Sequence, residues 1–121
     1  GFVDRWRNRQ LNIHPSLLPA YPGLDTHARA LRDGVRIHGC TVHFVRLEMD
    51  TGPIIAQAGV AVLPGDTPET LAARVLDAEH RLYPHALRLV ASGAVRVTND
   101  ILETAPPTDT PAALFSPPLR P

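Results

Sequence analysis

The stretch that decides the fold is NIHPSLLP, residues 12–19. It opens with the two-residue period of a strand, in which Asn12 and His14 share one face and Ile13 takes the other. Pro15 has no backbone N–H and holds the residue before it in an extended conformation, so we expect the strand to end at His14. An amide and an imidazole therefore lie next to each other at the carboxyl end of a strand.

Asn12 and His14 suit a reaction at a carbonyl group. The amide can donate a hydrogen bond to a developing oxyanion, and the imidazole can move a proton. The alternative is that both side chains simply hydrogen-bond nearby loop backbone, because an Asn-x-His pair is common. The pair alone does not decide between these two interpretations.

Two strands are expected downstream, at residues 37–45 and 54–62, joined by a short, turn-rich connection. Strands so closely connected are most simply antiparallel neighbours. A short helix is expected at residues 26–33, with Asp25 as its N-cap and Gly34 just past its end.

A long helix is expected to begin with Thr67 as N-cap and Pro68 in the first helical position. Pro84 should kink or divide it. A final strand is expected around Val95 and Val97, with a partner at residues 101–102. The helix's apolar residues step by three and four, as in an amphipathic helix: Leu71, Val75, Ala78, Leu82, Ala86 and Leu89.

This order of elements predicts an α/β fold: an open, mostly parallel sheet with an antiparallel edge. Ligands of such sheets bind beyond the carboxyl ends of the strands, where Asn12 and His14 are expected. Residues 1–105 form the expected domain portion. Residues 106–121 hold six of the 13 prolines and are expected to form a loosely ordered tail.

The overall composition narrows the function classes. Twelve basic and twelve acidic residues cancel, so no strong field favours nucleic acid or an anionic membrane. No apolar run reaches the length of a membrane span, and no signal-peptide pattern is present. The single cysteine, Cys40, excludes an internal disulfide. These features predict a soluble, cytoplasmic protein, with Cys40 packed in the core.

Two carboxylates are candidates to join the Asn-His pair. Asp50 follows the strand at 37–45, where the chain can return over the sheet and hold the imidazole. The alternative is that it merely favours a turn. Glu79 borders the apolar stripe of the long helix and needs a partner there. Its alternative is a salt bridge to Arg74 or Arg81. The histidine spacings indicate no metal site.

These motifs closely resemble those of the phosphoribosylglycinamide formyltransferases. The match begins with residues 12–19 and continues in order, with the right spacing, to about Val97. It includes YPGL at 21–24, TH at 26–27, HG at 38–39, VHFV at 42–45, MDTGPIIAQ at 49–57, EH at 79–80 and YP at 83–84.

The resemblance implies a formyltransferase Rossmann-like fold and transfer of a formyl group from 10-formyltetrahydrofolate to the amine of glycinamide ribonucleotide, in purine biosynthesis. It gives catalytic positions to Asn12, His14 and Asp50, and substrate contacts to Glu79 and Pro15. It also implies a cis peptide bond at Leu18-Pro19. The expected oligomeric state is a monomer or a homodimer. The residues implied to hold the folate are Val45, Arg46, Leu47, Glu48 and Asp50.

Two other functions remain open at this point. A formyltetrahydrofolate deformylase would use water in place of the amine and release formate. A folate- or nucleotide-binding fragment would not turn over at all. The chain matches only the C-terminal half of the family's domain, so we expect little activity from it alone.

Overall fold

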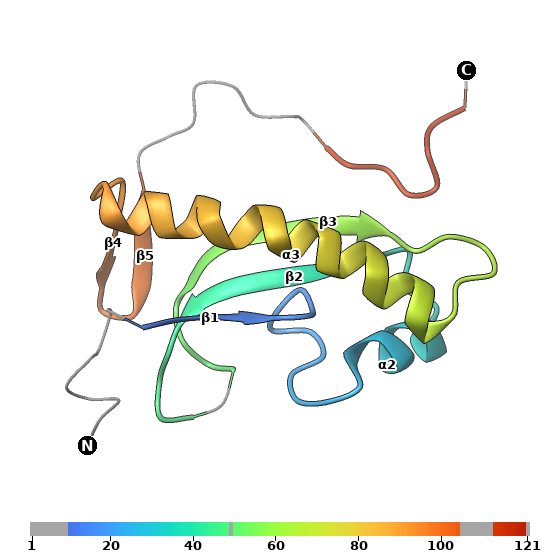
Figure 1. Cartoon of the computed structure of the whole chain (residues 1–121), viewed down its shortest axis with the longest axis horizontal. Helices are drawn as coiled ribbons and strands as arrows, with labels where there is room; N and C mark the ends of the chain where they lie inside the picture. Colours follow the sequence, from blue (N-terminus) through green and yellow to red (C-terminus); the bar gives the residue numbers. More distant parts are fainter. Residues whose placement is uncertain (1–9, 49, 105–112, 121) are drawn as a thin grey trace.

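The computed structural model describes residues 10–48, 50–104 and 113–120. Strands β1 (Leu11–His14), β2 (Ile37–Phe44) and β3 (Ile54–Ala61) form a sheet in that order. β1 and β2 are joined through the short helix α2 (Thr26–Asp33), which lies at one end of the sheet (Figure 1). These elements confirm the predicted helix and both predicted strands to within one residue at each end.

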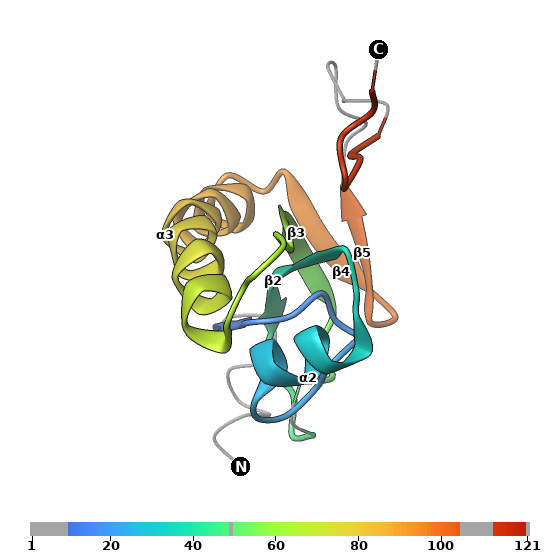
Figure 2. The ribbon, with the colours of Figure 1, turned by 90° about the vertical axis from the view of Figure 1, so that its right-hand side faces the viewer.

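The rest of the described chain is one long helix and a hairpin. Helix α3 (Pro68–Ala91) runs along one face of the sheet, as the turned view in Figure 2 shows. β4 (Val95–Thr98) and β5 (Ile101–Thr104) form a separate two-stranded sheet. Asn99 and Asp100 link them with φ angles of 53° and 59°. Two positive φ values are what a type I′ turn requires, and its twist matches that of the strands.

All strand pairs in the described residues are antiparallel. The predicted strand pair at 37–45 and 54–62 is confirmed, and so is the α/β class. The prediction of a mostly parallel sheet is not met within this chain. The connection through α2 turns at the end of the sheet and does not cross its face, so β2 starts where β1 stops and runs back beside it.

The core lies between α3 and the apolar face of the sheet. Leu71, Val75, Leu82 and Ala86 are the buried residues of α3, which confirms the predicted stripe. Removing such side chains from water stabilises the fold by about 25 cal/mol for each Å² of apolar surface. They pack in one cluster with Cys40, Val42, Phe44, Ile55 and Val95.

The helix ends follow the sequence signals in most respects. Thr67 caps α3 in a capping box with Thr70, and Pro68 is the first helical residue, as predicted. Gly34 ends α2 with a φ of 71°. Asp25 precedes α2, but its side chain makes no capping hydrogen bond.

Pro84 does not divide α3, which continues as a single helix from Pro68 to Ala91. A break is avoided because Leu82 and Ala86, on either side of the proline, are both anchored in the core, while Pro84 itself is exposed. The predicted tail at 106–121 lies partly outside the described residues. Its described part, 113–120, contains no helix or strand. No helix in the described ranges is long and apolar enough to cross a membrane.

Candidate active site

His14 and Asp50 come together at the end of β1. His14 Nδ1 lies 3.3 Å from Asp50 Oδ1, and the two side chains are only 8% and 6% exposed. The other carboxylate oxygen, Oδ2, accepts a hydrogen bond of 2.9 Å from the Gly23 N–H. The connection between β2 and β3 therefore carries a carboxylate back to the imidazole, so Asp50 is more than a turn residue.

The second nitrogen of the His14 ring faces loop backbone. Nε2 lies 2.9 Å from the carbonyl oxygen of Tyr21. A carbonyl oxygen only accepts hydrogen bonds, so Nε2 is the donor and carries a proton. The His14 ring therefore bonds loop backbone through one nitrogen, as one interpretation expected, and meets a carboxylate through the other.

Asn12 lies on the same face of β1 as His14, with its side chain exposed. It has no hydrogen-bond partner among the described residues, so its amide is available to a ligand. Its neighbour across the sheet is His43. His43 Nδ1 donates to the Phe44 carbonyl at 3.0 Å, whereas its Nε2 is buried without a partner in the described part of the chain.

Thr41 holds the loop that follows His14, a role the sequence analysis did not assign. It pairs with His14 across the sheet and is fully buried. Its Oγ1 donates to the Ser16 carbonyl at 2.7 Å and accepts from the Leu18 N–H at 3.1 Å. It also accepts at 3.0 Å from Gln57 Nε2, which donates to the Leu18 carbonyl as well. Thr41 and His43 are two residues apart on β2 and therefore share a face, which was the signal available in the sequence.

The Leu18-Pro19 peptide bond is cis, as the resemblance implied. The Pro15 carbonyl accepts a 2.6 Å hydrogen bond from Thr26 Oγ1, which ties the loop to the start of α2. A cavity of about 220 Å³ opens beside this loop and Asp50. It is lined by Leu18, Pro19, Asp50, Thr51, Gly52 and Ile54.

Two contacts hold the start of the expected folate loop, residues 45–50. The Val45 N–H donates to the Gln10 carbonyl at 2.9 Å. Arg46 forms an ion pair of 3.0 Å with Asp100 in the β4–β5 turn. Leu47 and Glu48 are exposed, while Met49 lies outside the described residues. The loop thus presents exposed residues close to Asp50.

Glu79 lies in a different pocket, on the α3 side of β1. This pocket has a volume of about 480 Å³ and is lined by Ile13, Leu76, Glu79, His80, Tyr83 and Pro84. Burial raises the pKa of Glu79, and the charges of His80 and His14 oppose this effect. The alternative of a bridge to Arg74 is wrong, because Arg74 pairs with Asp66 at 2.8 Å. No described residue forms a hydrogen bond or ion pair with the Glu79 carboxylate.

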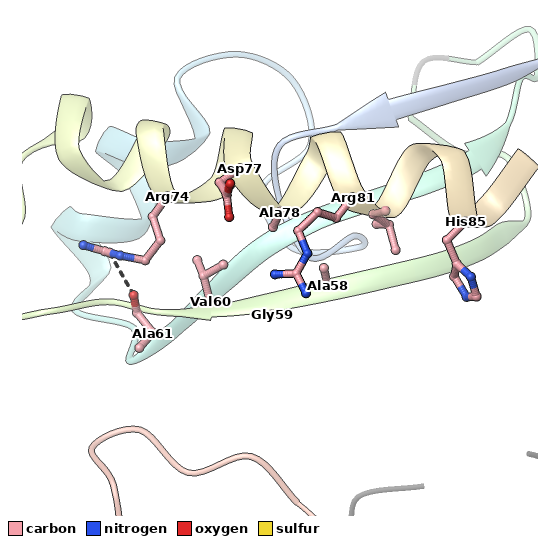
Figure 3. Close-up of a pocket in the computed structure, with 10 residues that line it drawn as sticks. Ala58, Gly59, Val60, Ala61, Arg74, Asp77, Ala78, Arg81 and His85 are labelled. Carbon is pink, nitrogen blue, oxygen red and sulfur yellow. Dashed lines mark hydrogen bonds between the residues drawn. The ribbon is translucent and has the colours of Figure 1, made fainter. Parts of the chain in front are cut away.

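A third cavity, of about 490 Å³, separates α3 from β3 (Figure 3). It contains none of the predicted site residues. Arg74 reaches the Ala61 carbonyl across one end, at 2.9 Å. Within the described ranges no cluster of three or more His, Cys, Asp or Glu side chains could hold a metal ion. Cys40 is fully buried, and burial raises the pKa of its thiol to about 11, which makes it a poor nucleophile.

The model of the formyl transferase family matches residues 1–87, which is most of the chain. The chain belongs to the formyl transferase family. Two curated relatives show which branch of the family this chain resembles. It is 58% identical to the trifunctional purine biosynthetic protein adenosine-3 of Gallus gallus, over 79% of this chain and 10% of the relative. It is 49% identical to the phosphoribosylglycinamide formyltransferase of Escherichia coli K12, over 80% of this chain and 46% of the relative.

A solved structure shows the same fold. The phosphoribosylglycinamide formyltransferase of Anaplasma phagocytophilum is 43% identical to this chain, with a TM-score of 0.83. That match covers 89% of this chain and 53% of the solved one. The resemblance to this enzyme family is thereby confirmed. The chain spans about half the length of the single-function relatives it matches.

Proposed function

We propose that the whole protein transfers a formyl group from 10-formyltetrahydrofolate to the amine of glycinamide ribonucleotide, in the cytoplasmic synthesis of purines. The contact of 3.3 Å between His14 and Asp50, with Asn12 on the same strand face, carries this proposal. The names of the relatives support the choice of substrates.

In the proposed reaction the amine nitrogen attacks the formyl carbon, and the carbonyl oxygen becomes an oxyanion. The exposed amide of Asn12 and a ring N–H of His14 donate hydrogen bonds to that oxygen. When the oxyanion collapses, the bond from carbon to the folate nitrogen breaks. The proton lost by the amine moves to the departing folate nitrogen, so the products are the formylated amine and tetrahydrofolate.

Asp50 has two tasks in this mechanism. Its carboxylate holds the His14 ring and keeps it positively charged, with a proton on each nitrogen. Through water, it also relays the proton from the attacking amine towards the folate nitrogen. Burial of the Asp50–His14 pair strengthens both effects, because charges interact more strongly where water is excluded.

Glu79 and the folate loop bind the two substrates in this proposal. The Glu79 carboxylate is half-buried and has no partner among the described residues, so it can accept hydrogen bonds from the hydroxyl groups of the nucleotide. Pro15, which follows His14 directly, is the second expected substrate contact. Residues Val45 to Asp50 hold the folate ring, next to the cavity at Asp50. The remaining half of the domain, present in the relatives, completes the site.

The test is Asn12→Ala in the whole protein. Loss of one oxyanion donor typically costs about 10²–10³ in rate, so we expect kcat to fall by that factor with little change in KM. Asn99→Gly is the matched control: it removes an amide in the β4–β5 turn, where glycine suits the positive φ. Near-normal turnover of the Asn12 variant would refute the assignment. Formate release without the amine substrate would identify a deformylase instead.

A further inference from the structure

The two nitrogens of the His14 ring are held unequally. Nε2 makes a true hydrogen bond of 2.9 Å to the Tyr21 carbonyl, a backbone group with no proton to exchange. Nδ1 faces Asp50 at 3.3 Å, an ion-pair distance that is long for a charge-assisted hydrogen bond. The loosely held nitrogen is therefore the one beside the carboxylate that takes part in the proposed proton relay.

Tyr21 is itself clamped from several directions. Its backbone has a φ of 51°, a left-handed conformation that costs energy in a residue with a Cβ. Its hydroxyl donates to Asp33 Oδ2 at 2.7 Å, and the guanidinium of Arg29 lies 5.4 Å above its ring. The ring also meets the edge of His38, with a centroid distance of 6.1 Å.

Arg29 secures the backbone on the far side of Tyr21. Its Nη1 donates to the Pro22 carbonyl at 2.6 Å and to the Leu24 carbonyl at 2.9 Å. Arg29 and Asp33 are one turn apart on α2, so a single helix fixes both the side chain of Tyr21 and the backbone that follows it. These contacts hold the Tyr21 carbonyl in its strained position, facing His14.

We infer that Tyr21 is a positioning residue whose backbone carbonyl anchors His14 Nε2, so that Nδ1 is the nitrogen that faces the reacting groups. The inference rests on the proposed formyl transfer and specifies which N–H meets the oxyanion. The Nδ1 proton exchanges its loose contact with Asp50 for a hydrogen bond to the oxyanion. The Nε2 proton stays on the ring and keeps its hydrogen bond to the Tyr21 carbonyl throughout, which keeps the ring plane fixed.

The experiment is nitrogen-15 NMR of histidine-labelled whole protein, read beside steady-state kinetics. In the wild type we expect a hydrogen-bonded Nε2 proton that exchanges slowly with water. Addition of 10-formyltetrahydrofolate should shift the Nδ1 resonance of His14 and leave the Nε2 resonance in place. A shift of Nε2 in place of Nδ1 would overturn the inference. This readout does not depend on turnover, so it is separate from a failure of the proposed function.

Two substitutions of Tyr21 test the contribution of its side-chain contacts with Asp33, Arg29 and His38. Tyr21→Ala keeps the strain of a Cβ at positive φ but removes the side-chain contacts; we expect loss of the slow Nε2 proton and about a tenfold fall in kcat, with KM unchanged. Tyr21→Phe keeps the ring contacts and should retain both signals. If Tyr21→Ala does not fold, the pair Arg29→Met with Asp33→Ala should give the same loss. Normal kcat, or a lower kcat with the Nε2 proton intact, would overturn the inference.

Discussion

One buried hydroxyl supports much of the loop that follows His14. Thr41 Oγ1 donates a hydrogen bond to the Ser16 carbonyl and accepts hydrogen bonds from the Leu18 N–H and from Gln57 Nε2. Thr41 is also the residue that pairs with His14 in the sheet. Hydrogen bonds of this kind contribute little net stability one at a time, but a buried donor or acceptor left without a partner is costly. The effect of losing this hydroxyl should therefore exceed that of losing one ordinary hydrogen bond.

The prediction concerns Thr41→Val, which has nearly the same shape and no hydroxyl. We expect the free energy of unfolding to fall by about 1–3 kcal/mol, because the Leu18 N–H and the Ser16 carbonyl lose their buried partner. Thr41→Ser keeps the oxygen and should lose less. Urea unfolding of the whole protein measures both. Equal stability of the Val and Ser variants would show that the hydroxyl does not hold the loop.

At the scale of the elements, β2 and β3 depend on a place where no side chain fits. Gly39 and Gly59 are directly paired across the two strands. A Cβ at Gly39 would lie 1.9 Å from the Ala58 carbonyl oxygen and 2.9 Å from the Leu17 side chain. A Cβ at Gly59 would approach nothing closer than 3.4 Å, the distance to the side chains of Ile37 and Leu114. The same chemical change therefore has different consequences on the two strands.

We predict that Gly39→Ala destabilises the protein by at least about 1–3 kcal/mol, since β2 and β3 must move apart to admit the methyl group. Gly59→Ala should change stability by less than about 0.5 kcal/mol, as an ordinary surface substitution does. Thermal unfolding of the two variants beside the wild type decides the matter. A Gly39 variant as stable as the Gly59 variant would contradict the close approach.

The elements show what periodicity can predict. Three features could be predicted from the sequence, because each follows from the geometry of a single helix or strand. They are the apolar stripe of α3, the start of α3 at Thr67–Pro68 and the alternation of β2. The direction of β1 relative to β2 could not be predicted, since it depends on where α2 packs. Nor could the continuity of α3 through Pro84, which its anchored neighbours Leu82 and Ala86 secure. The turn at Asn99-Asp100 carried a usable signal, as both residue types tolerate positive φ.

Some residues of the candidate site could likewise be predicted from the sequence, and others could not. His14 and Asp50 could be named from the residues and the resemblance, and the structure brings them together. The role inferred for Tyr21 could not, because it acts through a backbone carbonyl that every residue possesses. Thr41 and Gln57 also could not be named, because their partners are backbone groups of the loop after His14. A sequence states which side chains are available for chemistry, but it does not state where the backbone groups that orient them will lie.

At the scale of the whole molecule, a buried pair of histidines couples stability to pH. His38 is almost completely buried, and its Nε2 lies 3.2 Å from Nδ1 of His27. Burial, together with the charges of His27 and His14, lowers the pKa of His38 from 6.5 to about 4. Burial lowers the pKa of His27 as well. Both histidines are therefore neutral in the folded protein at neutral pH.

The sign of the effect follows from linkage. Between pH 6.5 and 4 the unfolded chain binds a proton at His38 that the folded chain does not, so stability is complete above 6.5 and is lost as the pH falls towards 4. A shift of this size corresponds to about 3 kcal/mol. Unfolding of the wild type and of His38→Gln at pH 7 and pH 4.5 tests this. The variant should lose less stability on acidification; an equal loss would exclude His38 as the cause.

Positive φ angles store backbone strain at Tyr21 and Asp50, which contact the His14 ring, and at Asp25, which precedes α2. Glycine would relieve that strain at each position, and at Asp50 it would delete the carboxylate in the same step. A laboratory selection for heat resistance alone would consequently enrich glycine at these three positions and discard chemistry in exchange for robustness. A selection for higher thermal stability in this protein should therefore measure turnover after every round of selection.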